Sequence, residues 1–106
     1  MSSEYTPDVK KYDKGADEKV IAGIVKHLGI ALRGKDASMV SCSSKDELAR
    51  VRDSWLKKKL GLDDDNAKLD AMVKAVCEEM KDEKRKHRVT FYYLLAKNAG
   101  KLSDLT

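Results

Sequence analysis

The stretch Arg88-Val89-Thr90-Phe91-Tyr92-Tyr93-Leu94-Leu95-Ala96, near the end of the 106-residue chain, decides the fold. Its β-branched and aromatic residues would also suit a strand. No second strand candidate exists to pair with it, and Asp82 before it and Gly100 after it are typical helix start and stop signals. We therefore predict a helix that Asp82 caps and that ends at Gly100. Because the half that begins at Arg88 is apolar on almost all sides, it should be the central element on which the others pack.

Three other segments show the spacing of amphipathic helices, over residues 17–32, 44–60 and 66–80. In the first, apolar residues recur at three- and four-residue intervals from Val20 to Leu32. Gly23 and Gly29 lie inside this segment and indicate either close helix packing or an early end near Gly29. The third has the clearest pattern, with one apolar stripe made of Leu69, Met72, Val73, Val76, Cys77 and Met80.

Local signals mark the ends of the second of these helices. Ser44-Lys45-Asp46-Glu47 has the pattern of a capping box, in which the Ser44 hydroxyl accepts from the Glu47 amide and the Glu47 carboxylate reaches back. Leu60-Gly61-Leu62 predicts the end of the helix, because Gly61 can adopt the left-handed conformation that follows a last helical turn.

The residues between and before the helices complete the fold prediction. Asp63-Asp64-Asp65-Asn66 is a polar connector that supplies an N-cap for the third helix. Residues 1–16 are polar and suit an arm or one short helix, and residues 17–106 form a single helical domain. The predicted fold class is all-α, a compact bundle of four main helices with a possible short N-terminal helix.

Composition bounds what this domain can be. Apolar residues make up 42% of the chain and charged residues 38%, which suffices for one core under a charged surface. The longest apolar runs, 20–25 and 91–96, are far shorter than the roughly 20 residues that cross a bilayer as a helix, so we expect no membrane partner. The start of the chain shows neither an export signal nor a lipid-anchor motif.

The two cysteines, Cys42 and Cys77, stand alone in the sequence, without a CxxC motif or a histidine at ligand spacing. Cys77 falls on an apolar helical stripe and is interpreted as a small buried hydrophobe. Cys42 lies in a serine-rich loop, where a reactive thiol is the alternative to an inert one. This usage predicts a reduced, cytoplasmic protein.

Chemistry-bearing patterns are missing from the sequence. The candidate nucleophiles are loop serines and Cys42, and the two histidines, His27 and His87, are interpreted as surface residues. Asp63-Asp64-Asp65 lacks the alternate spacing of a calcium loop, and the chain has no Walker lysine loop and no GxGxxG motif. We predict no enzymatic activity, no catalytic residue, no cofactor and no metal.

Two kinds of binding remain, and the formal net charge of +4 decides little between them. Residues 81–106 hold seven basic and three acidic residues, and the cluster Lys84, Arg85, Lys86 and Arg88 could contact nucleic-acid phosphates in a weak, salt-dependent way. The same cluster could equally be a solvated face. Trp55, Tyr92 and Tyr93 are candidate contacts for a protein partner or a second copy, although such rings are also common in cores. We favour a non-enzymatic protein-interaction or self-association module, with nucleic-acid binding as the alternative.

The C-terminal half also resembles a small bacterial family that is catalogued only as a domain of unknown function. The resemblance covers roughly the last 60 residues well and the first 40 loosely, and it implies a single-domain, all-helical protein of about this length. It brings no activity and no site residues. The segments that carry it are Lys58-Lys59-Leu60-Gly61-Leu62, Leu69-Asp70 with Val73 and Val76, Arg85-Lys86-His87-Arg88, and Tyr92-Tyr93-Leu94-Leu95.

Overall fold

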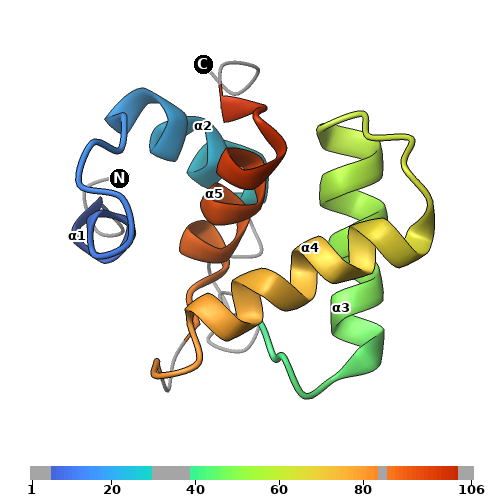
Figure 1. Cartoon of the computed structure of the whole chain (residues 1–106). Coiled ribbons are helices and arrows are strands. Elements are labelled where there is room, and N and C mark those ends of the chain that lie inside the picture. Colours follow the sequence, from blue (N-terminus) through green and yellow to red (C-terminus); the bar gives the residue numbers. More distant parts are fainter. Residues whose placement is uncertain (1–5, 30–38, 84–85, 103–106) are drawn as a thin grey trace.

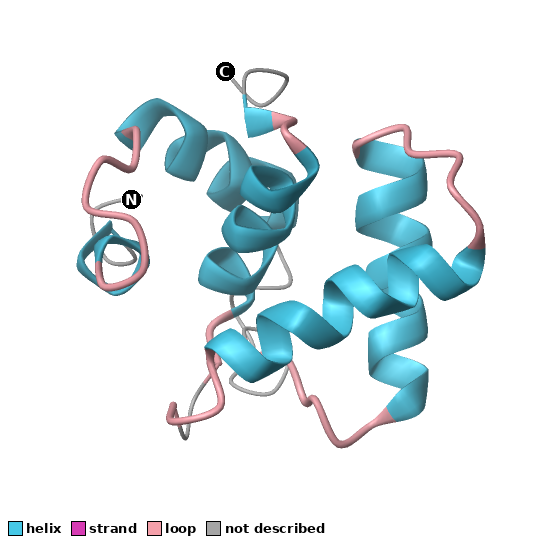
Figure 2. Ribbon diagram, in the orientation of Figure 1, coloured by secondary structure: helices cyan, strands magenta, loops and turns pink. Residues whose placement is uncertain are grey.

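The computed structural model describes residues 6–29, 39–83 and 86–102, and it confirms the all-α prediction (Figures 1 and 2). Within these residues there is no strand, and the one β-bridge joins Met39 to His87. The elements are α1 (Thr6–Lys10), α2 (Glu18–Leu28), α3 (Lys45–Val51), η3 (Arg52–Lys59), α4 (Asn66–Glu79) and α5 (Arg88–Ala99). No helix in the described part of the chain is both long and apolar enough to cross a membrane.

Helix α5 is the central element, as its composition predicts. Every side chain from Val89 to Ala96 is buried, and the helix contacts α1, α2, α4 and η3. Figure 1 shows α5 with α1 and α2 to one side and α4 to the other. A helix that is apolar on nearly all faces lowers its free energy only when neighbours cover each face. Gly100, at φ +71°, ends it as expected.

Helix α3 begins with half of the predicted capping box. The Ser44 hydroxyl accepts from the Glu47 amide at 3.3 Å. The Glu47 carboxylate does not return to Ser44, because it accepts from Arg88 of α5, while the Ser44 amide donates to the Ser41 carbonyl. A tertiary ion pair has replaced the local hydrogen bond.

The same helix continues as the π-helical segment η3 and stops where predicted. The Leu60 amide donates to the Trp55 carbonyl, five residues back. Gly61 then adopts φ +68°, and the Leu62 amide donates to the Leu56 carbonyl at 2.9 Å. These bonds satisfy carbonyls at the helix end that would otherwise lack a donor.

Helix α4 matches the predicted third helix closely. The Asp65 carboxylate caps it by accepting from the Lys68 amide at 2.9 Å. The predicted stripe faces the core: Leu69, Val73, Val76 and Met80 are buried, and Met72 and Cys77 are half-buried.

The start of α5 differs from the prediction. The helix begins at Arg88 with His87 as its N-cap residue, and Asp82 does not cap it. The cause is a tertiary pairing: the Val40 amide donates to the Lys86 carbonyl at 2.8 Å, beside the Met39–His87 bridge. A backbone that pairs in this extended way cannot also be helical.

Helix α2 has the early end near Gly29 that is one of its two predicted outcomes. It ends at Leu28, and Gly29 takes φ +40° with its amide bonded to the Val25 carbonyl. Residues 30–32 of the predicted helix lie outside the described residues.

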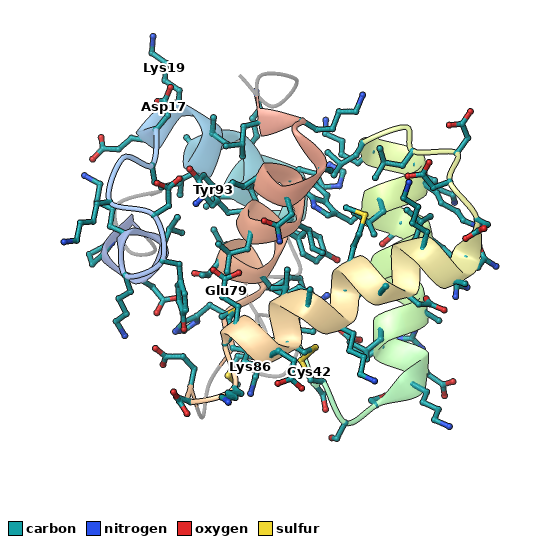
Figure 3. The ribbon with its side chains drawn as sticks, viewed as in Figure 1. Asp17, Lys19, Cys42, Glu79, Lys86 and Tyr93 are labelled. Carbon is teal, nitrogen blue, oxygen red and sulfur yellow. A yellow bond between two sulfur atoms is a disulfide. The ribbon has the colours of Figure 1, made fainter. Side chains whose placement is uncertain are left out.

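The N-terminal segment packs on α5 through buried polar contacts. Val9 of α1 is fully buried. The Thr90 hydroxyl donates to the Asp8 carboxylate. The hydroxyl of Tyr93, which is labelled in Figure 3, donates to the Asp13 carboxylate at 2.6 Å. Two aspartates therefore attach this polar segment to the central helix.

Candidate functional site

A disulfide between Cys42 and Cys77 corrects the prediction that the two cysteines stand alone (Figure 3). The residues lie 35 apart in the sequence, and their Cα atoms are 6.0 Å apart. Local spacing could not reveal this pair, because the fold brings the loop before α3 against the last turn of α4. Cys77 is accordingly half-buried at the core edge rather than inside the core.

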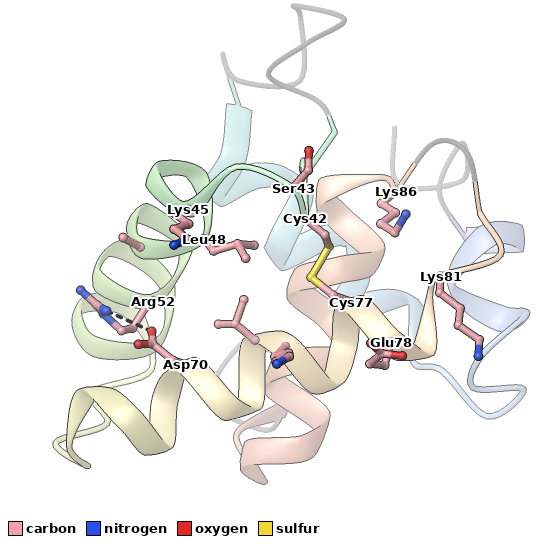
Figure 4. Close-up of a pocket in the computed structure, with 13 residues that line it drawn as sticks. Cys42, Ser43, Lys45, Leu48, Arg52, Asp70, Cys77, Glu78, Lys81 and Lys86 are labelled. Carbon is pink, nitrogen blue, oxygen red and sulfur yellow. Dashed lines mark hydrogen bonds and ion pairs between the residues drawn. A yellow bond between two sulfur atoms is a disulfide. The ribbon is translucent and has the colours of Figure 1, made fainter.

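Beside this disulfide lies a surface hollow, which we call the α3–α4 groove. Its volume is about 780 Å³, within the range of about 300–1,000 Å³ that is usual for ligand sites. Figure 4 shows the Arg52–Asp70 ion pair on one side of the disulfide and Lys81 and Lys86 on the other. The lining residues are Cys42, Ser43, Lys45, Leu48, Ala49, Arg52, Asp70, Val73, Lys74, Cys77, Glu78, Lys81 and Lys86.

The floor of the groove is apolar. Leu48 and Ala49 come from α3 and Val73 from α4, and the disulfide sulfurs extend this surface. Leu48 packs against the core but remains partly exposed. The two helices thus leave apolar surface uncovered where they diverge.

The rim of the groove is cationic, and part of its charge is unbalanced. Arg52 donates to Asp70 at 3.0 Å and to Asp53, and Lys86 donates to the Glu83 carbonyl at 3.0 Å. Lys45, Lys74 and Lys81 form no ion pair with any residue that the structure describes. Five basic residues therefore line the groove against two acidic ones, Asp70 and Glu78.

The structure describes only two of the four residues of the predicted basic cluster, Lys86 and Arg88. Lys84 and Arg85 lie outside the described residues. Lys86 lines the α3–α4 groove. The Arg88 side chain is only 12% exposed and bonds to the Glu47 carboxylate and the Met39 carbonyl, so it serves the packing of α5 on α3.

The three predicted partner contacts, Trp55, Tyr92 and Tyr93, lie in the core. They are 0%, 5% and 1% exposed. The Trp55 indole N–H donates to the Tyr92 carbonyl at 3.1 Å. The rings of Trp55 and Tyr92 stack, with their centroids 4.6 Å apart. This burial leaves these rings almost no surface for a partner.

The histidines do not form a reactive centre with the groove. The His27 ring lies 5.3 Å from that of Trp55, and burial together with the nearby charge of Lys59 lowers the pKa of His27. His87 lies in the backbone pairing before α5. Among the described residues, no group of three or more His, Cys, Asp or Glu side chains could hold a metal ion.

Sequence reasoning missed the groove because its residues are ordinary where they stand. Lys45 is the first residue of α3, and Lys74 lies on what looks like the solvent face of α4. The partly exposed Leu48 is one of the apolar residues of the amphipathic helix predicted over residues 44–60, and its sequence position gives no sign that it remains uncovered. Only the angle between α3 and α4 brings these residues around one hollow.

Fold and groove together define a small all-α domain with a disulfide-bordered, cationic surface hollow. The chain belongs to the family described as "Protein of unknown function (DUF2853)", whose model matches residues 4–103. This confirms the resemblance to a family catalogued only as a domain of unknown function. No curated protein matches the chain.

Proposed function

We propose that this protein is a non-enzymatic interaction module that binds an acidic, amphipathic segment of a partner protein in the α3–α4 groove. One observation carries the proposal: lysines without an ion-pair partner among the described residues surround an apolar floor. An apolar ligand side chain would cover Leu48 and the disulfide, and removing that surface from water is favourable.

Charge complementarity selects the acidic class of ligand. Lys45, Lys74 and Lys81 concentrate positive charge around one hollow, which favours encounter with a negative segment. A hollow of about 780 Å³ has the volume of a small-ligand site and therefore suits a short segment rather than a whole protein face.

The other predicted roles have less support. Nucleic-acid binding is predicted for the cluster Lys84, Arg85, Lys86 and Arg88. In the structure, Arg88 pairs with Glu47 where α5 packs on α3 and is therefore little exposed. Self-association was predicted through rings that lie in the core. A cytoplasmic location stays a prediction. It is inferred from two cysteines that stand alone in the sequence, and the disulfide between them removes this support.

The test is fluorescence anisotropy of a labelled short peptide that contains only Glu and Leu. Matched peptides of Lys and Leu, and of Glu and Ser, serve as ligand controls. We expect the Glu/Leu peptide to bind best and to weaken as salt rises from about 50 to about 500 mM, because exposed charges are then screened. Equal binding of all three peptides would refute the proposal.

The variants place this binding in the groove. The double variant Lys45→Glu with Lys74→Glu should bind at least about 30-fold more weakly, since each reversal replaces an attraction of about 0.5–1 kcal/mol by a repulsion of similar size. Lys19→Glu with Lys68→Glu changes the net charge equally at exposed helical positions outside the groove and should bind like the wild type. An equal loss in both variants would contradict the assignment. Tighter binding of duplex DNA than of the acidic peptide would favour the nucleic-acid alternative.

A further inference from the structure

The Cys42–Cys77 disulfide borders the α3–α4 groove instead of lying inside the core (Figure 4). Both cysteines are half-buried, and both line the hollow. A thiolate must reach a disulfide sulfur to exchange with it, so access is the first condition for reactivity. A ligand held in this groove would lie beside these sulfurs.

Cationic side chains surround the disulfide. Lys74 lies three residues before Cys77 on α4, a spacing that places two side chains near one another at a helix surface. Lys81 follows the end of α4 and lines the same hollow. Both lysines line the same hollow and have no ion-pair partner among the described residues. Glu78 is the carboxylate nearest to Cys77 in sequence within this lining.

These charges favour two stages of an exchange reaction. Positive charge attracts an incoming anionic thiolate. It also stabilises the thiolate that leaves, and a more stable leaving thiolate departs faster. Because Lys74 lies one helical turn before Cys77 on α4, Cys77 is the better leaving group and Cys42 the better target.

We propose that the Cys42–Cys77 disulfide is a thiol-exchange site for an anionic thiol. The thiolate of the ligand attacks Sγ of Cys42 and forms a mixed disulfide, while the Cys42–Cys77 bond breaks and its electron pair leaves on Sγ of Cys77. A second ligand thiolate attacks the ligand sulfur of the mixed disulfide, which releases a ligand disulfide and the Cys42 thiolate. Two ligand thiols are thereby oxidised and the protein disulfide is reduced.

This inference rests on the groove of the proposed function and names a chemistry for its ligand. The anionic thiol could be a free small molecule or a cysteine within the acidic partner segment. Both share the negative charge that the lysines select.

The test uses three small thiols that differ in one end group: 2-mercaptoethanesulfonate, 2-mercaptoethanol and 2-mercaptoethylamine. Mixed-disulfide formation on the oxidised full chain is followed by intact mass after acid quenching, and rates are expressed per thiolate. The sulfonate should react about tenfold faster than the amine at about 50 mM salt, and the difference should narrow at about 500 mM. Equal rates for the three thiols would overturn the proposal.

Variants and a peptide map complete the test. Lys74→Glu with Lys81→Glu should abolish the preference for the sulfonate, whereas Lys19→Glu with Lys68→Glu should keep it. The ligand should be found on Cys42, and attachment to Cys77 would overturn the assigned direction of attack.

A cysteine-containing version of the Glu/Leu peptide separates the two sources of thiol. Faster reaction of this peptide than of the sulfonate supports a partner cysteine, and slower reaction supports a small thiol. Binding of the thiol-free peptide is measured separately by anisotropy. If that binding persists while thiol selectivity is absent, the exchange proposal fails and the proposed function stands. If the thiol-free peptide does not bind but the sulfonate preference is present, the proposed function fails and the exchange site stands.

Discussion

Replacing Tyr93 by Phe tests how the N-terminal segment is attached to the central helix. The Tyr93 ring is 1% exposed, and its hydroxyl donates to the Asp13 carboxylate at 2.6 Å. The substitution keeps the buried ring and removes this hydrogen bond. Asp13 would retain only the Gly15 amide at 3.2 Å and the Lys97 ammonium at 3.9 Å.

The expected cost follows from the burial of the two partners. A hydrogen bond to a charged group contributes about 1.5–3 kcal/mol when it is well buried. The Asp13 side chain is 22% exposed and keeps two other partners, so the lower part of that range applies. We expect Tyr93→Phe to lower the free energy of unfolding by about 1–2 kcal/mol at pH 7.

The pH dependence gives the sign of the effect. The hydrogen bond from Tyr93 holds the pKa of Asp13 below its usual value of 3.8. The stabilisation is therefore fully present above the unfolded pKa and is lost as the pH falls through the folded pKa of Asp13. Burial, and then the bond to Asp13, raise the pKa of Tyr93 above 10, so the stabilisation is also lost under strongly alkaline conditions.

Urea denaturation, followed by the fluorescence of the single tryptophan, Trp55, measures the loss in free energy of unfolding and its dependence on pH. A double-mutant cycle with Asp13→Asn isolates the coupling, which should be about 1–2 kcal/mol near pH 7 and should shrink toward pH 3. A coupling below about 0.3 kcal/mol, the usual error of additivity, would refute the reasoning. So would a coupling that is independent of pH.

Two further predictions concern the ends of helices. Arg88→Met should lower the free energy of unfolding by about 3–5 kcal/mol, because it leaves the Glu47 carboxylate, which is 18% exposed, and the Met39 carbonyl without this donor. Adding Glu47→Leu should recover part of this loss in thermal unfolding. No recovery would contradict the ion-pair argument. Gly61→Ala should lower the free energy of unfolding by about 1–2 kcal/mol. This cost comes from backbone strain at φ +68° alone, because nothing lies within 4 Å of the added Cβ and no clash contributes. Gly15→Ala, where φ is not positive and the added Cβ meets Asp13 at 3.7 Å, serves as its control in urea denaturation and should change stability little.

Much of the fold follows from short-range signals in the sequence. Ser44 and Asp65 cap helices through their own side chains, and Gly61 and Gly100 end helices because glycine tolerates positive φ. Each of these features involves residues within one or two helical turns. The apolar character of residues 89–96 likewise predicts a central helix, because burial on all faces is a property of that segment itself.

The features that sequence reasoning missed all depend on residues far apart in the chain. Pairing of Val40 with Lys86 keeps Lys86 and His87 out of α5, although Asp82 has the local character of a cap. Arg88 is basic in sequence but forms the ion pair that draws Glu47 away from its capping role.

The sequence by itself determined an all-α domain, its central helix and most of its helix ends, because caps, periodicity and glycine conformations act within a few residues. Tertiary structure alone decided the Cys42–Cys77 pairing, the burial of Trp55 and the α3–α4 groove. The physical reason is that a groove exists only where two helices diverge and leave lysines and apolar side chains facing one hollow. The charge and hydropathy of Lys45, Lys74 and Leu48 are plain in the sequence, but the packing angle that brings these residues together is set by the whole core.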